Sequence, residues 1–203
     1  NGTETITIRA QDTGGEEDTQ DVVVTVNPVN DAPIIDAIGD VSFQEDDSAQ
    51  IVVSATEVDA GDELTYTCTE VGSIMCDVVG TTITFSAPEN FVGTEQLTVT
   101  VRDLDEEEDS TPVNVEVIGV NDPPVLDVIP DIVEGDGFDE DETYIITANA
   151  TDPDGDNITY VCDPSNNIPC SVNGANITLQ PNPDWNGTET ITIRAQDTGG
   201  EED

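Results

Sequence analysis

The sequence predicts an all-β fold made of tandem antiparallel β-sandwiches, each with about seven strands. Three observations support this fold class. Apolar and polar residues alternate with a period of two in many short segments, turn-forming residues separate these segments roughly every 8–12 residues, and a unit of about 90 residues occurs twice. No segment carries a sustained apolar stripe at helical spacing, so helices are not expected.

Each expected strand is a short run whose alternate residues face opposite sides of a sheet. In the run 97–101, Leu97, Val99 and Val101 face one side and the two threonines face the other. Aromatic residues make up only 4% of the chain, so the cores are expected to be thin and aliphatic. The expected strands cover residues 22–26, 50–55, 64–68, 81–85, 97–101, 113–117, 144–150, 176–179 and 191–195.

Internal repetition divides the chain into homologous units. VNDAP at 29–33 returns as VNDPP at 120–124, and NFVGTEQLTVTVRD at 90–103 returns as DWNGTETITIRAQD at 184–197. A missed period of this kind would misassign the whole fold. We therefore assign residues 30–120 to a repeat A and residues 121–203 to a repeat B.

The two ends of the chain carry the same text. Residues 1–18, NGTETITIRAQDTGGEED, are identical to residues 186–203, and residues 19–29 align with 110–120, the last strand of repeat A. Residues 1–29 are thus read as the last two strands of a preceding B-type repeat, and repeat B lacks its own last strand. The two copies start 185 residues apart. We therefore expect that the chain is a window on a longer array in which A and B repeats alternate. Neighbouring copies of the repeat would be its partners end to end, in a covalent polymer or in a donor-strand polymer.

Charge excludes several classes of partner. The chain has 46 acidic residues against 3 basic ones, for a net charge of -43. Nucleic acid and anionic membrane surfaces are not expected as partners, because binding to either requires Lys or Arg. No apolar run approaches the roughly 20 residues of a membrane-spanning helix, so no membrane insertion is expected in this segment.

Enzymatic chemistry is not expected. The chain contains no His and no Lys, and it has no free thiol if its cysteines are paired. Paired carboxylates would formally allow glycoside hydrolysis, but the aromatic content is too low for a carbohydrate-binding cleft.

Four cysteines occupy the same two positions in each repeat: Cys68 and Cys76 in A, Cys162 and Cys170 in B. A pair within each repeat predicts two disulfides, which would place the protein outside a reducing cytosol. Free buried thiols are the alternative. A zinc site made of all four thiolates would need both pairs in one place and a shorter spacing within each pair.

Asn-x-Ser/Thr sequences give a second extracellular indication. They begin at Asn1, Asn157, Asn176 and Asn186, all in B-type sequence. Such sequences also arise by chance in Thr-rich strands, so glycosylation and an unmodified surface are both open.

The linker motifs VNDAP and VNDPP, ATDPDGDNITY at 150–160, PENFVG at 88–93 and the strands ending at Asp103 and Asp197 carry a family resemblance. In combination they resemble bacterial or archaeal cadherin-like, immunoglobulin-like tandem repeats of giant surface adhesins and extracellular filaments. The resemblance covers essentially the whole chain. It implies Ig-like or cadherin-like sandwiches at an extracellular, cell-surface location. Glu57 stands where the family has its first loop Asp, and the LDRE motif of animal cadherins is absent.

The acidic residues gather in loops between strands that are nearly free of charge, which is the pattern of a Ca²⁺ protein. An evenly acidic, salt-adapted surface is the alternative, and a solvated turn is the alternative for DPDGD alone. Stacked sandwiches would bring linker and loop acids together. The expected Ca²⁺ ligands are Asn121, Asp122, Asp152, Asp154, Asp156 and Asp197 with Glu45, Asp46 and Glu89 between A and B; Asn30, Asp31, Asp59, Asp62 and Asp103 before A; and Glu140, Asp141 and Asp184 after B.

Two functions remain. The first is structural: a calcium-rigidified, disulfide-stapled segment of an extracellular filament or cell-surface stalk. The second is a ligand- or glycan-binding adhesin module for cell–cell adhesion or biofilm. The scarcity of aromatic residues favours the first, because carbohydrate recognition generally uses exposed Trp or Tyr.

Overall fold

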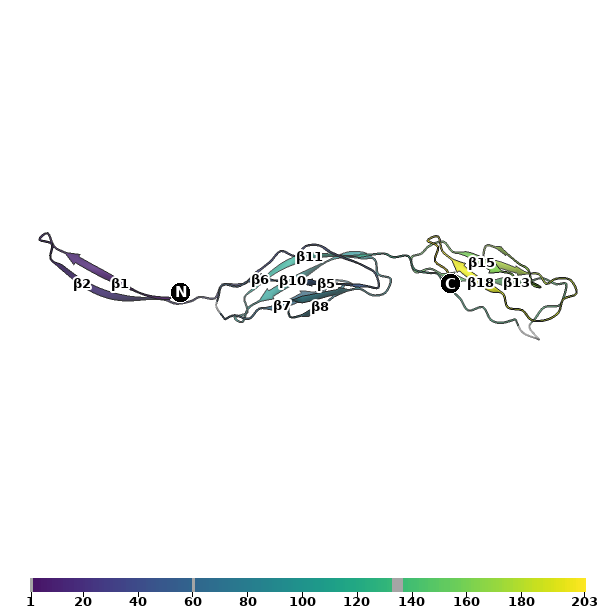
Figure 1. The fold of residues 1–203 in the computed structure, drawn as a ribbon, viewed down its shortest axis with the longest axis horizontal. Helices are drawn as coiled ribbons and strands as arrows, with labels where there is room; N and C mark the ends of the chain where they lie inside the picture. Colours follow the sequence, from purple (N-terminus) through teal and green to yellow (C-terminus); the bar gives the residue numbers. More distant parts are fainter. Residues whose placement is uncertain (1, 60, 133–136) are drawn as a thin grey trace. The chain divides into compact units, whose positions relative to one another are not determined.

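The computed structural model describes residues 2–59, 61–132 and 137–203 (Figure 1). Within these ranges it contains eighteen β-strands and no helix, so the all-β prediction is confirmed. Accordingly, the described chain has no helix with the length and hydropathy needed to span a bilayer. Two compact units are distinguished: Asn1–Ser42, Ser48–Ala87 and Thr94–Glu116 make the first, and Phe43–Asp47, Pro88–Gly93 and Val117–Asp203 make the second.

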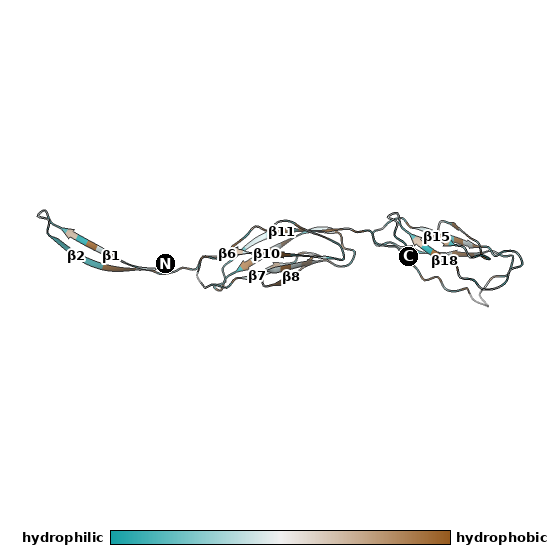
Figure 2. Ribbon diagram, viewed as in Figure 1, coloured by the Kyte–Doolittle hydropathy of each residue, from teal (hydrophilic) through white to brown (hydrophobic). Residues whose placement is uncertain are grey.

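The first two strands form an isolated antiparallel hairpin. β1 (Gly2–Gln11) pairs with β2 (Glu17–Val26) in a register that runs from Gly2 opposite Val26 to Gln11 opposite Glu17. Every residue of both strands is exposed, although Figure 2 shows hydrophobic segments on each of them. The hairpin therefore has the alternating pattern of a half-buried sheet but no core beneath it.

Residues of repeat A form a sandwich of two principal sheets. One sheet has the strand order β4–β11–β10–β7, the other has the order β5–β9–β8, and β3 forms a short pair with β6. The strands are β3 (Ile34–Ile35), β4 (Val41–Gln44), β5 (Ser48–Val52), β6 (Ala55–Thr56), β7 (Thr65–Thr69), β8 (Met75–Val79), β9 (Thr82–Ser86), β10 (Gly93–Arg102) and β11 (Glu108–Ile118).

The core of this sandwich follows the predicted alternation. Leu97, Val99 and Val101 on β10 are fully buried, and Ile83 and Phe85 on β9 face them from the other sheet as fully buried residues. The intervening threonines of β10 are more exposed. Period-two alternation therefore identified the buried face of these strands correctly.

One expected strand in each repeat is wrong as a continuous element. Residues 50–55 divide between β5, which pairs with β9, and β6, which pairs with β3. In repeat B, residues 144–150 divide in the same way between β13 (Tyr144–Thr147) and β14 (Ala150–Thr151). The chain changes hydrogen-bond partners at the break: Val53 N–H donates to the Thr81 carbonyl, whereas the Ser54 carbonyl accepts from Asp36 N–H.

Repeat B has the same plan, but the counterpart of the four-stranded sheet has two strands in the described chain. β13, β17 and β16 form a three-stranded sheet, β12 pairs with β14, and β15 pairs with β18. Ala148, Ile177 and Leu179 form the buried cluster of this repeat, and the rings of Phe138 and Tyr144 stack at its side with centroids 5.2 Å apart. The remaining strands are β12 (Val125–Leu126), β15 (Thr159–Asp163), β16 (Cys170–Asn173), β17 (Asn176–Leu179) and β18 (Thr192–Gln196).

The two identical 18-residue segments share a turn but not a complete strand. Gly15 and Gly200 both have a positive φ, of 91° and 99°, and Asp12 and Asp197 each donate their N–H to the carbonyl four residues later. However, β1 begins at Gly2 whereas β18 begins only at Thr192, the counterpart of Thr7. The same sequence therefore forms a longer strand where β2 pairs with its whole length.

Both predicted disulfides are present. Cys68 on β7 is bonded to Cys76 on β8, and Cys162 on β15 is bonded to Cys170 on β16, with Cα atoms 6.2 and 6.3 Å apart. In each repeat the bond joins an edge strand of one sheet to an edge strand of the other. Each disulfide therefore links the two sheets of its sandwich covalently.

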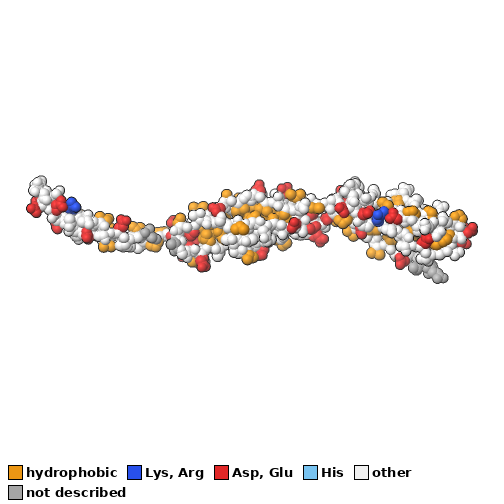
Figure 3. Space-filling view, viewed as in Figure 1, with side chains coloured by type: hydrophobic (Ala, Val, Ile, Leu, Met, Phe, Trp, Pro, Cys, Tyr) orange, Lys and Arg blue, Asp and Glu red, His pale blue; other side chains and the backbone are white. Residues whose placement is uncertain are grey.

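Surface charge is almost all negative (Figure 3). The three arginines serve local ion pairs across hairpins or neighbouring strands: Arg9 with Glu17, Arg102 with Glu108, and Arg194 with Asp163 and Glu202. Exposed pairs of this kind contribute only about 0–1 kcal/mol each. They leave most of the acidic residues without a positive neighbour.

The described sequon residues lie at the surface. Asn157, Asn176 and Asn186 are exposed, and the Asn176 side-chain oxygen accepts a hydrogen bond from the Thr147 hydroxyl. Asn1 lies outside the described residues.

Candidate cation sites

The Asn-Asp pair that begins each repeat is held in the same way in A and in B. Asn30 Nδ2 donates to Asp103 Oδ2 at 2.9 Å, and Asp31 N–H donates to Asp59 Oδ2 at 2.8 Å. The equivalent bonds in B are Asn121 Nδ2 to Asp197 Oδ2 at 2.7 Å and Asp122 N–H to Asp154 Oδ2 at 2.8 Å. The linker is thereby fastened to two acidic loops before any cation is considered.

One acidic cluster lies within the second compact unit. Carboxylate oxygens of Glu45, Asp122 and Asp154 all lie within 4.8 Å of one another. Glu45 is only 4% exposed, and its Oε1 accepts a 2.6 Å hydrogen bond from the N–H of Val120. Its own N–H donates to the carbonyl of Ile118, which ties the residue after β4 to the last residue of β11. Three separate segments thus supply the oxygens of this cluster.

The electrostatics of this first cluster favour a bound cation. Burial raises the pKa of Asp122, and the negative charges of Glu45, Asp154, Asp46 and Glu89 raise it further. A raised pKa means that the ionised carboxylate is disfavoured where it stands. A divalent cation at this point would remove the penalty, because it would place positive charge among the oxygens.

A second cluster lies in the loop between β6 and β7 of the first unit. Carboxylate oxygens of Glu57, Asp59 and Asp62 lie within 4.8 Å of one another, and all three residues are half-buried. Glu57 Oε1 accepts hydrogen bonds from the N–H groups of Val58 and Asp59 at 2.6 and 2.8 Å. Gly61, with a φ of 105°, provides the left-handed turn that the loop requires.

Like charges also act on this second cluster. Burial raises the pKa of Asp62, and the charges of Glu57, Asp103, Asp105 and Asp59 raise it further. Glu57 was not among the expected ligands, because it replaces the first loop Asp of the family pattern. Alignment of Glu57 with Asp152 was the available signal, and the longer side chain still reaches its neighbours.

Several carboxylate oxygens are buried without a hydrogen-bond partner in the described structure: Glu45 Oε2, Asp122 Oδ2, Asp152 Oδ2 and Glu57 Oε2. A buried polar atom without a partner costs free energy, and an ionised one costs more. The two clusters contain three of these atoms, and the fourth belongs to the DPDGD loop. A hard cation such as Ca²⁺ requires oxygen ligands that converge on one point and are not already engaged in hydrogen bonds. The residues therefore fit this ion.

Asp103 and Asp197 hold turns and position the linker. Each is nearly buried, at 5% and 6% exposure, and each accepts its linker Asn at Oδ2. Their Oδ1 atoms accept backbone N–H groups of the following turn, from Glu107 in one case and from Gly200 and Glu201 in the other. Neither residue belongs to the two described clusters, so their geometry supports a positioning role.

Hydrogen bonds together affect the pKa of Asp197 more than burial does. Burial acts to raise the pKa of Asp197, but hydrogen bonds from the Asn121 side chain and from the N–H groups of Gly200, Glu201 and Gly199 lower it overall. This carboxylate is therefore stabilised in its ionised form without a metal.

As far as the chain is described, the other expected ligands lie outside both clusters. Asp152 Oδ1 accepts the N–H groups of Asp154 and Asp156 at 3.0 Å, and Asp156 Oδ2 accepts the Thr198 hydroxyl at 2.9 Å. The remaining expected residues are Asn30, Asp31 and Asn121 in the linkers, Asp46 and Glu89 near Glu45, and Glu140, Asp141 and Asp184 at the far end of repeat B.

The far end of repeat B repeats the backbone geometry around Glu45. Asp46 and Asp141 both adopt a positive φ, of 61° and 68°, and accept the N–H of Asn90 and of Asp184 at 3.4 Å. Glu140 occupies the position equivalent to Glu45 but is exposed. Each turn therefore forms from its own local sequence. Burial of the glutamate depends in addition on which residues cover it, because Glu45 is buried and Glu140 is not.

The repeats are matched by a known sequence family. The family model of the bacterial Ig domain matches residues 30–116 and again residues 121–203. The chain belongs to the bacterial Ig domain family. It carries two such domains in tandem. Among curated proteins, none matches the chain.

Solved structures show the same fold as these bacterial Ig domains. Segment EC21–23 of human CDH23 aligns with a TM-score of 0.55 and 20% identity over 100% of this chain and 72% of that structure. The protocadherin gamma B4 extracellular domain aligns with a TM-score of 0.55 and 19% identity, over 99% of this chain and 36% of that one. Protocadherin gamma B7 domains 1–4 align with a TM-score of 0.51 and 15% identity, over 100% of this chain and 56% of that one. The cadherin-like resemblance is thus confirmed for the fold.

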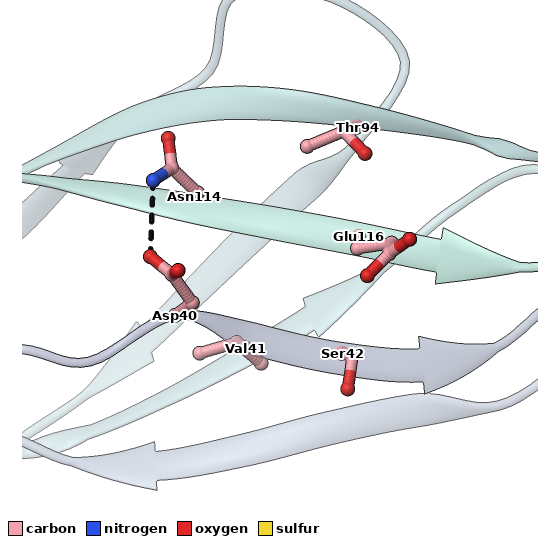
Figure 4. Close-up of a pocket in the computed structure, with 6 residues that line it drawn as sticks. All are labelled: Asp40, Val41, Ser42, Thr94, Asn114 and Glu116. Carbon is pink, nitrogen blue, oxygen red and sulfur yellow. Dashed lines mark hydrogen bonds between the residues drawn. The ribbon is translucent and has the colours of Figure 1, made fainter.

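A shallow pocket of about 310 Å³ lies on the outer face of β4, β11 and β10 (Figure 4). Its lining includes Asp40, Thr94, Asn114 and Glu116, and Asn114 Nδ2 donates to Asp40 Oδ1 at 3.0 Å. No aromatic residue lines it. The pocket therefore lacks the stacking surface that sugars generally require.

Proposed function

We propose that these tandem bacterial Ig domains form a structural segment of an extracellular filament or cell-surface stalk whose linkers are made rigid by Ca²⁺. Bacterial Ig and cadherin-type domains, together with two disulfides, suggest an extracellular location. Domain families of this type are typically non-enzymatic. The proposal therefore concerns mechanics and assembly.

The single observation that carries the proposal is the convergence of Glu45, Asp122 and Asp154. Two of their oxygens, Glu45 Oε2 and Asp122 Oδ2, are buried and have no hydrogen-bond partner among the described residues. Three carboxylates in such proximity repel one another, and a bound Ca²⁺ would supply two positive charges to offset this repulsion. Asp122 belongs to the linker, so its attachment to both Glu45 and the loop at Asp154 would restrict the linker backbone.

The alternative function, an adhesin module that binds a ligand or glycan, has weaker support. The pocket on β4, β11 and β10 is polar and lacks aromatic residues. Trp185, the one tryptophan of the chain, is half-buried and packs over Gly187. The structural role is therefore the better-supported proposal.

Titration calorimetry with Ca²⁺ on the whole chain tests the proposal. We expect saturable binding, and we expect Glu45→Gln to weaken binding at the first cluster by about tenfold because it removes one charged ligand. Glu116→Gln removes one charge from an exposed site on β11 and is the matched control. Binding that is not saturable, or that Glu45→Gln and Glu116→Gln change equally, would show diffuse attraction to an acidic surface and would overturn the proposal.

A further inference from the structure

In repeat A, a glutamate on β10 holds the loop that the disulfide closes. Glu95 lies two residues before the buried Leu97, so it is on the inner face of its strand. Its Oε1 accepts the N–H of Ser73 at 2.8 Å, and its Oε2 accepts the N–H of Ile74 at 3.0 Å. Both donors belong to loop 69–75, which lies between the bonded cysteines of this repeat. Two successive backbone N–H groups of the loop therefore bind one carboxylate.

Repeat B uses the equivalent glutamate in the same way. Glu189 accepts the N–H of Asn167 at Oε2, at 3.1 Å, and the side-chain amide of Asn167 at Oε1, at 2.5 Å. Asn167 occupies the position of Ser73, in loop 163–169 that the second disulfide closes. The two loops, TEVGSIM and DPSNNIP, have only their isoleucine in common at equivalent positions. The glutamate and one backbone N–H are therefore the parts that both repeats share.

The loops are fitted to a carboxylate in its ionised form. In repeat A, a Cβ atom on Gly72 would overlap Glu95 Oε1, so the loop approaches the carboxylate as closely as glycine allows. In repeat B, hydrogen bonds from the Ser165 side chain and from the backbone and side chain of Asn167 lower the pKa of Glu189. A lowered pKa means that these bonds favour the charged carboxylate over the neutral acid. The bonds are therefore charge-assisted, which makes them stronger than neutral hydrogen bonds.

The disulfide and the glutamate restrain the same loop from different strands. Cys68 is on β7 and Cys76 is on β8, in two different sheets, whereas Glu95 is on β10. Each restraint removes conformational freedom that the loop would otherwise lose when the other restraint forms. Two events that order the same segment therefore favour each other. By reciprocity, the factor by which the glutamate stabilises the disulfide equals the factor by which the disulfide strengthens the bonds of the glutamate.

We propose that Glu95 and Glu189 are positioning residues for the two disulfides: they hold each loop so that its cysteines pair and resist reduction. In exchange with oxidised glutathione, one protein thiolate attacks the oxidant, forms a mixed disulfide and releases one glutathione thiolate. The second protein thiolate then attacks the protein sulfur of the mixed disulfide and releases the other, so two electrons pass to the oxidant. The glutamate takes no part in these bonds and acts through the loop. This role is separate from the proposed filament function and does not rest on cation binding.

Equilibration of the whole chain with glutathione redox buffers in EDTA tests this role. Alkylation and peptide mass spectrometry then give the equilibrium constant of each disulfide separately. Glu95→Gln leaves one acceptor oxygen instead of two, so we expect the constant of the repeat A disulfide to fall roughly tenfold, which corresponds to about 30 mV. The repeat B disulfide should not change, and Glu189→Gln should give the converse result, so each variant contains its own control. Glu116→Gln, at an exposed site on β11, should change neither constant.

Gly72→Ala provides a second arm, because it keeps the carboxylate of Glu95 but displaces it from the loop. Gly72 does not have a positive φ, so alanine fits its backbone conformation. The variant should lower the constant of the repeat A disulfide as Glu95→Gln does, and the double variant should lower it no further. Circular dichroism checks that the sandwiches are intact. An unchanged repeat A constant in either single variant, or a variant that shifts both disulfides equally, would overturn the proposal.

Discussion

The side-chain amide of Asn121 donates a 2.7 Å hydrogen bond to the carboxylate of Asp197, 76 residues further along the chain. Asn30 and Asp103 form the equivalent bond at 2.9 Å in the first repeat. In both repeats the partner aspartate is nearly buried and also holds the turn of a hairpin. One short contact thus joins the start of each domain to the loop that follows β10 in the first repeat and β18 in the second.

Removal of this amide should destabilise repeat B. Asn121→Ala leaves Asp197 Oδ2 without its partner, and a buried acceptor without a partner costs about 1–3 kcal/mol. We expect a loss of that size in the free energy of unfolding, measured by urea denaturation. Asn114→Ala is the control, because it removes an Asn–Asp contact of 3.0 Å that is exposed. Equal losses of unfolding free energy in the two variants would show that the buried contact stabilises the fold no more than the exposed one.

The stability of the metal-free chain should pass through a maximum as the pH falls. The pKa values of Asp122 and Asp62 are raised, so the folded chain binds their protons more tightly than the unfolded chain does, and stability rises as pH falls through those pKa values. The pKa values of Asp197 and Glu189 are lowered, so their contribution is present above the unfolded value of about 4 and is lost below it. Thermal melts in EDTA between neutral pH and pH 3 check this, and a steady decline from neutral pH would contradict it.

Asp122→Asn should have opposite effects with and without Ca²⁺. In EDTA the substitution removes one member of a mutually repelling group, so the melting temperature should rise. In Ca²⁺ it removes a charged ligand, so the additional stabilisation from the ion should be reduced. Differential scanning calorimetry of both proteins in both buffers measures the two signs. The same sign in both buffers would mean that the residue does not bind the ion.

Glu57 should contribute to a second, independent cation site. Glu57→Gln is expected to reduce the number of bound Ca²⁺ ions by one without changing the affinity at Glu45, because the two clusters lie in different compact units. Glu57→Asp, which restores the residue of the family pattern, should retain binding. Calorimetric stoichiometry distinguishes these variants, and unchanged stoichiometry in Glu57→Gln would exclude a site at this loop.

Reduction of the disulfides should affect repeat B more than repeat A. Each bond closes a short loop, so its loss costs roughly 2.5 kcal/mol by the chain-entropy estimate. Among the described residues, fewer are buried in repeat B than in repeat A to offset that cost. Urea titration of the Cys162→Ser/Cys170→Ser and Cys68→Ser/Cys76→Ser variants should show the earlier transition for the former. The reverse order would indicate that the stability of repeat B does not depend on its small core.

Local features of the sequence were sufficient to predict which strand faces are buried and which cysteines pair. Leu97, Val99 and Val101 were assigned to the core by alternation alone, because the side-chain period of a strand is two. Cys68 and Cys76 were paired by their short spacing and its recurrence in repeat B. Pairing across long distances was not available in this way, which is why the expected strand 50–55 was not seen to divide between β9 and β3.

The sequence by itself determined that acidic loops and linkers are the candidate cation sites, because their spacing recurs in both repeats. Only the tertiary structure decided which oxygens converge. Asp103 and Asp197 turn toward backbone N–H groups, whereas Glu45, from a turn more than 70 residues before the linker, lies beside Asp122. A carboxylate can accept from a turn or join a cluster, and the choice depends on which N–H groups and charges lie within a few ångströms. Those neighbours are set by the packing of β4, β11 and the loops, which no local pattern of residues specifies.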